Sequence, residues 1–95
     1  MSAGESVLER ERAEIERIDR EVVRLIELRL AAARTAAAAK RVAGVSVVDP
    51  AQEAAVIRRA AEWAREMGIP DEEVRDLFWA LVGLTRRAEL SGGQP

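Results

Sequence analysis

Two basic residues in an alanine-rich segment are the first candidates for chemistry. Residues 26–41 read IELRLAAARTAAAAKR and hold Arg29 and Lys40 among small apolar residues. In a helix, eleven residues return to within about 20° of the starting direction and advance roughly 16 Å, so the two cations share one face. Cations that face a core need an anionic partner there. The spacing therefore places both charges on one inward face, with alanines leaving space between them.

Two other polar pairs have helical spacing. Asp49 and Glu53 stand four residues apart, as do Thr85 and Glu89, so each pair lies on one helix face. Taken singly, Asp49 reads as a helix N-cap, Glu53 as a partner of the helix dipole, and the second pair as ordinary surface. The two cations could likewise extend their heads into solvent or pair with carboxylates of other helices. Only the whole set points to a site.

The composition excludes several kinds of site. The 95 residues include no Cys and no His, so neither a thiolate nor an imidazole is available as nucleophile, base or metal ligand. A net charge of -2 argues against nucleic-acid binding through an overall basic field. No apolar run approaches the roughly 18 residues of a membrane span, and the first residues are too charged for a secretory signal. We expect a cytoplasmic protein.

The helices that must position these residues are marked by their breakers. Gly44, Gly68 and Pro70 interrupt a chain rich in Ala, Leu, Arg and Glu, which are strong helix formers. They predict a single all-α domain with one very long helix over about 5–42, a loop at 43–48, and two shorter helices over about 50–67 and 71–90. Asp49 and Asp71 are the expected N-caps. Residues 91–95 are expected to be a disordered tail.

One apolar stripe follows the long helix, and its members recur every three or four residues: Leu8, Ile15, Ile18, Val22, Leu25 and Ile26. Continued at the same spacing, the stripe reaches Arg29, Ala32 or Ala33, Ala36 and Lys40, and Arg12 lies on its edge. A 38-residue helix is longer than a domain of this size is wide. We therefore expect a second copy of the chain to cover the stripe, giving a homodimer whose pockets are built from both subunits.

In this set of residues the chain resembles the all-helical class of chorismate mutases over about residues 8–90. The resemblance is carried in order and spacing by positions in three predicted helices: Arg12, Ile15, Asp19, Arg29 and Lys40 in the first, Val47, Asp49 and Glu53 at the start of the second, and Thr85 and Glu89 in the third.

The resemblance implies an intertwined homodimer with two identical sites that rearrange chorismate to prephenate, without cofactor, metal or nucleophile. Arg12 of the partner subunit and Arg29 would bind the two carboxylates, and Lys40 would hydrogen-bond the ether oxygen of the breaking C–O bond. Asp49 and Glu53 would hold the ring hydroxyl and orient the cations. Thr85 would support the ring or a carboxylate, and Glu89 would complete the site beside the ether oxygen.

Two positions depart from the family pattern. Gln52 stands where most relatives have arginine, which removes one cation in or near the site. Glu89 stands where many relatives have glutamine, and a glutamate donates a hydrogen bond only when protonated. We expect Glu89 to be partly buried and protonated during catalysis, so that activity favours acidic pH. The alternative is a Glu89 that is ionised throughout and pairs with Lys40 or Arg86.

Other functions remain open at this point. Proteins with the same fold act on 4-amino-4-deoxychorismate or on isochorismate, and Gln52 and Glu89 leave room for such a substrate. The chain could also be a regulatory homologue without activity, or a structural dimerisation module. Trp63, Phe78 and Trp79 are expected to pack in the core or an interface, since they lie on helix stripes. The pairs 58–59 and 86–87, all arginine, are expected on solvated faces.

Overall fold

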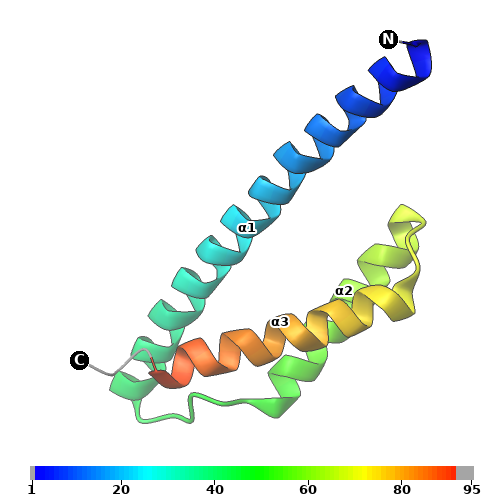
Figure 1. The fold of residues 1–95 in the computed structure, drawn as a ribbon. Helices are drawn as coiled ribbons and strands as arrows, with labels where there is room; N and C mark the ends of the chain where they lie inside the picture. The colour runs from blue at the N-terminus through cyan, green and yellow to red at the C-terminus, as the bar shows by residue number, and fades with distance from the viewer. Residues whose placement is uncertain (1, 92–95) are drawn as a thin grey trace. The chain divides into compact units, whose positions relative to one another are not determined.

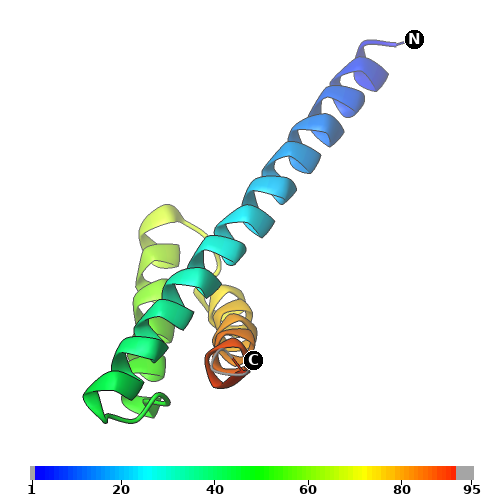
Figure 2. The ribbon, with the colours of Figure 1, turned by 90° about the vertical axis from the view of Figure 1, so that its left-hand side faces the viewer.

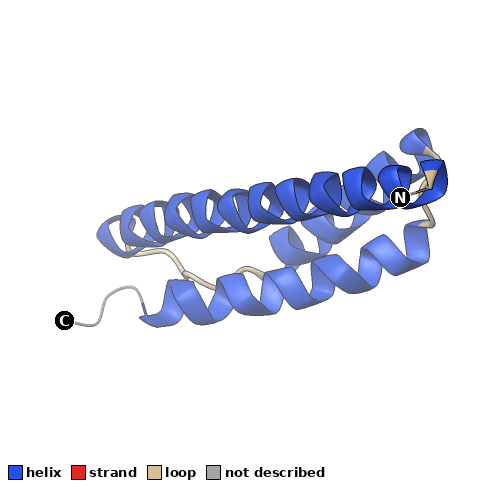
Figure 3. Ribbon diagram, turned by 45° about the horizontal axis from the view of Figure 1, so that its top comes forward, coloured by secondary structure: helices blue, strands red, loops and turns tan. Residues whose placement is uncertain are grey.

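The chain is entirely helical, apart from its connections, over the residues that the structure describes. The computed structural model describes residues 2–91, and within them the chain forms α1 (Ala3–Ala43), α2 (Pro50–Met67) and α3 (Asp71–Ser91) and no strand (Figures 1 and 3). This confirms the all-α class with a very long first helix. Ser91, expected in the tail, ends α3, and the rest of the expected tail lies outside the described residues. None of the helices over residues 2–91 combines the length and hydropathy of a bilayer span.

The chain divides into two compact units, the first ending at Ala31 and the second beginning at Ala32. The first unit is the N-terminal part of α1. Its polar side chains form ion pairs one turn apart, Glu14 with Arg17 at 2.6 Å and Glu21 with Arg24. Its predicted apolar stripe is open to solvent, since Ile15 is 57 % and Ile18 is 44 % exposed. The first unit by itself therefore leaves this face uncovered.

The second unit contains the end of α1 and a hairpin of α2 and α3, which lie side by side (Figures 1 and 2). Its buried residues are mostly small: Ala37 in α1, Ile57, Ala60, Ala61 and Ala64 in α2, and Val82, Thr85 and Ala88 in α3. Alanine lets helix axes approach closely but removes little apolar area from water. Among the described residues, no large side chain is fully buried. The core of the second unit therefore buries little apolar surface.

Local backbone signals set the ends of these helices. Gly44 and Gly68 adopt left-handed φ values of 74° and 73°, and amides that follow α1 and α2 bond back to carbonyls of the last turn. Asp49 is the N-cap of α2, as expected, with Pro50 as the first helical residue. The expectation that Asp71 caps α3 is wrong. The Pro70 carbonyl accepts the Val74 amide, so Asp71 is already helical, and its carboxylate binds Arg65 at 2.7 Å.

Two aromatic residues lie on the surface of the chain, not in its core. Trp63 is 47 % and Trp79 is 56 % exposed, whereas Phe78 is half-buried. The guanidinium of Arg59 lies 5.3 Å from the ring centre of Trp63, within the range of a cation–π contact. Of the two predicted locations, the core of one chain is excluded for both tryptophans. Packing in an interface stays a prediction.

Candidate active site

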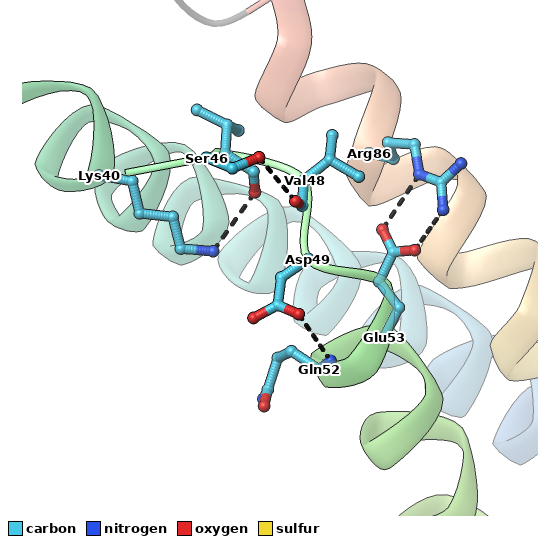
Figure 4. A network of polar contacts seen from close by, with 8 residues as sticks. Lys40, Ser46, Val48, Asp49, Gln52, Glu53 and Arg86 are labelled. Carbon is cyan, nitrogen blue, oxygen red and sulfur yellow. Dashed lines mark hydrogen bonds and ion pairs between the residues drawn. The ribbon is translucent and has the colours of Figure 1, made fainter. Parts of the chain in front are cut away.

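Lys40 sits in the last turn of α1 and is half-buried. Its Nζ donates to the backbone carbonyl of Val47 at 3.4 Å, a long contact within the loop that leads to α2 (Figure 4). A weak neutral acceptor leaves an ammonium available to a better one. Lys40 is therefore held near the loop and keeps donors for an anionic ligand.

The alanine tract before Lys40 is buried along one face, and this face matches the expected one only in part. Ala33 is half-buried and Ala37 is completely buried, whereas Ala32 and Ala36 are exposed. The buried face thus steps from 33 to 37 to 40, and the prediction for Ala36 is wrong by one residue. Ala37 is small enough to let other parts of the second unit approach α1 closely.

Asp49 is the N-cap of α2, which is one of the two roles predicted for it from the sequence. Its Oδ1 accepts a hydrogen bond from the backbone amide of Gln52 at 3.1 Å, and the residue is exposed. Ser46, on the same loop, donates to the Val48 carbonyl at 2.8 Å and stiffens the approach to the cap. Figure 4 shows Lys40, Asp49 and Glu53 gathered around this loop.

Glu53, in the first turn of α2, is bound by an arginine from α3. The Nε of Arg86 donates to Oε2 at 3.0 Å, and its Nη2 donates to Oε1, so the pair is bidentate (Figure 4). The hydrogen bonds and charge of Glu53, and more weakly the charge of Glu89, raise the pKa of the Arg86 guanidinium. Arg86 is exposed, as expected for a solvated face, and its guanidinium also binds Glu53. The partners are 33 residues apart, and nothing in their local spacing joins them.

Thr85 and Glu89 lie one turn apart near the end of α3. Thr85 is only 9 % exposed, and its hydroxyl donates to the Leu81 carbonyl one turn earlier at 2.8 Å, so the surface reading of this residue is wrong. Glu89 is half-buried, as expected. Its backbone carbonyl accepts a hydrogen bond from Arg41, in the last turn of α1. Arg41 was not among the predicted residues, because only tertiary packing brings it to α3.

Arg12 and Arg29 belong to the first unit. Arg12 is exposed, and Arg29 is half-buried. The structure therefore brings Lys40, Asp49, Glu53, Thr85 and Glu89 into the second unit, together with Arg41 and Arg86. With no Cys or His in the sequence, these groups offer charges and hydrogen bonds. Such a set is suited to holding an anionic ligand that carries a hydroxyl group.

Comparison with known protein families matches the chain to chorismate mutase type II over residues 11–90. No curated protein and no solved structure matches the chain. The matched range includes α2, most of α1 and α3, and every predicted site residue, from Arg12 to Glu89. The chain belongs to the type II chorismate mutases, the helical isomerases that convert chorismate to prephenate.

Proposed function

We propose that the chain performs this reaction at a site made by the seven predicted residues: Arg12, Arg29, Lys40, Asp49, Glu53, Thr85 and Glu89. The observation that carries the proposal is the family match, which spans all seven positions. The contacts in the second unit support it, since they hold Lys40, Glu53 and Glu89 near helix ends where their polar groups can meet a ligand.

The reaction is an intramolecular Claisen rearrangement, in which one C–O bond breaks while one C–C bond forms. It needs no proton donor in principle, but the flexible dianion must be held in its compact conformer. Negative charge that develops on the ether oxygen must also be stabilised. Arg29 and Arg12 of the partner subunit bind the two carboxylates, because a guanidinium fork matches a carboxylate in two places. Lys40 donates to the ether oxygen.

The opposite wall of the site carries the acidic residues. Glu53 and Asp49 receive the ring hydroxyl, and Thr85 supports the ring or a carboxylate. Glu89 donates to the ether oxygen from its protonated form, since an ionised carboxylate has no proton to give. Protonation also removes one negative charge from a pocket that must accept a dianion.

A homodimer is the expected assembly. The stripe of the first unit is exposed, and the core of the second unit is built largely of alanine, so one chain buries little apolar surface. A second copy on the stripe covers it and brings Arg12 of the partner subunit to the site. The stripe follows the part of α1 that lies in the first unit, which suits a helix-to-helix contact between identical chains.

The substrate is tested by offering three related compounds separately: chorismate, 4-amino-4-deoxychorismate and isochorismate. We expect turnover of chorismate, because Asp49 and Glu53 stand at the positions that receive a ring hydroxyl in the pattern of the chorismate mutases. Faster turnover of the amino compound, or release of pyruvate from isochorismate, would assign the chain to one of these alternatives. No turnover of any of the three would leave a binding or dimerisation role.

A further inference from the structure

The Glu53–Arg86 pair joins the first turn of α2 to the C-terminal half of α3. The Glu53 side chain is 15 % exposed and the Arg86 side chain 44 %, so the carboxylate is the more enclosed partner. Two parallel donors, Nε and Nη2, face its two oxygens (Figure 4). A bidentate contact fixes the plane of a carboxylate as well as its position. Arg86 therefore sets the direction in which Glu53 can accept further hydrogen bonds.

The pair leaves Glu53 able to bind a ligand. An ionised carboxylate offers about four lone-pair directions, and a guanidinium fork uses one along each oxygen. The remaining directions lie on the outer edges of the two oxygens. A hydroxyl group of a ligand can donate there without breaking the contact with Arg86. The ligand then meets a carboxylate that is already ordered, which lowers the entropic cost of binding.

Charge balance gives Arg86 a second effect. The proposed site has three cations, Arg12, Arg29 and Lys40, against three carboxylates. With Glu89 protonated, as proposed above, this set has a net charge of +1, although its ligand is a dianion. Gln52, next to Glu53, adds no charge. A guanidinium bound to Glu53 offsets that carboxylate and shifts the balance toward positive.

We propose that Arg86 is a positioning residue of the active site, which acts through Glu53 by orienting its carboxylate and offsetting its charge. This inference rests on the proposed function, because it assigns Glu53 to the substrate. Arg86 itself does not touch the reacting atoms. A purely structural ion pair would hold α2 and α3 together and would affect stability without acting through the Glu53 carboxylate.

A double-mutant cycle separates these roles. The full-length chain would be prepared as wild type, Arg86→Gln, Glu53→Gln and the double variant, with Arg87→Gln as the control on the neighbouring exposed arginine. Turnover of chorismate gives kcat and KM, and circular dichroism gives the thermal midpoint, so that assays run well below unfolding. Should Arg86→Gln fail to fold, Arg86→Lys takes its place in the cycle, since lysine keeps the charge but lacks the fork.

We expect Arg86→Gln to lower kcat/KM by about tenfold, mainly through KM, and Arg87→Gln to change it by less than about twofold. In the Glu53→Gln background, loss of Arg86 should change kcat/KM by less than about twofold, because the group it positions is gone. Independent, multiplicative losses would overturn the inference, as would equal activity of the Arg86 and Arg87 variants. An inactive wild type would instead overturn the proposed function, and this inference with it.

Discussion

Arg41 donates a hydrogen bond from its Nη2 to the backbone carbonyl of Glu89, and so ties the end of α1 to the last turns of α3. The final carbonyls of a helix have no partner within the helix. Arg41 supplies one at Glu89, which we propose as a hydrogen-bond donor to the ether oxygen. The contact thus links the stability of the second unit to the geometry of its candidate site.

Replacing Arg41 tests this link. Arg41→Ala removes one hydrogen bond to a charged group, which should lower stability by about 1 kcal/mol and the thermal midpoint by about 4–8 °C. Thermal unfolding followed by circular dichroism measures the change. Arg34→Ala is the matched control, because Arg34 is an exposed arginine two turns earlier on the same helix. Equal midpoints for the two variants would show that the Arg41 contact contributes nothing.

The ion pair between Arg65 and Asp71 should make a small contribution to the free energy of unfolding, and this contribution should be lost at acidic pH. The hydrogen bond and charge of Arg65 lower the pKa of the Asp71 carboxyl below its usual range. A group with a lowered folded pKa stabilises the fold above its unfolded pKa, and this contribution disappears as pH falls through the folded value. Asp71→Asn should therefore be less stable than wild type at neutral pH, and the gap should close below about pH 4. A gap that persists at low pH would assign the effect to another cause.

Much of the fold follows from local sequence signals. Gly44, Gly68 and Asp49 act at their own positions, through left-handed turns and an N-cap, so their effects can be predicted without tertiary structure. The start of α3 does not follow from such a signal. The sequence predicts Asp71 as the cap, but the carbonyl of Pro70 begins the hydrogen bonding of α3, and Asp71 lies inside the helix.

The site was predicted in its residue types but not in its tertiary contacts. Spacing along one helix is enough to place Thr85 and Glu89 on the same face, because the direction of a side chain around the helix axis follows from its residue number. It cannot pair Glu53 with Arg86, because that contact depends on how α2 and α3 rotate about their axes when their alanines pack. The burial of Ala37 in place of Ala36 has the same origin: a small rotation of the helix exchanges neighbouring residues at the edge of a face.

Glu89 predicts the pH dependence of the reaction. If its protonated form donates to the ether oxygen, activity should rise as pH falls, and Glu89→Gln should flatten the profile because an amide donates at every pH. The measurement is kcat/KM for chorismate between about pH 5 and 9. Glu62→Gln, at an exposed position in α2, controls for the loss of a charge. An unchanged profile for Glu89→Gln would refute this role.

The exposed stripe predicts a dimer that a single charge can disrupt. Ile18→Asp places an anion on the stripe, where a second copy would have to bury it without a partner, so the variant should be monomeric and inactive. Light scattering on a sizing column gives the mass. Arg20→Asp introduces the same side chain on the opposite face and should remain a dimer. A wild type that is already monomeric, or an Ile18→Asp dimer, would remove the basis for a shared site.

The central claim is that fixed cations on α1 bind chorismate for rearrangement, and Arg29 tests it most directly. The measurement is the conversion of chorismate to prephenate by wild type and by Arg29→Ala, with the mass of each protein checked in solution. We predict that wild type is active. Arg29→Ala should have the same mass in solution, and therefore the same oligomeric state. Its kcat/KM should fall roughly a hundredfold, because a substrate carboxylate loses its bidentate partner. A wild type without activity, or an Arg29→Ala variant as active as wild type, would contradict the account.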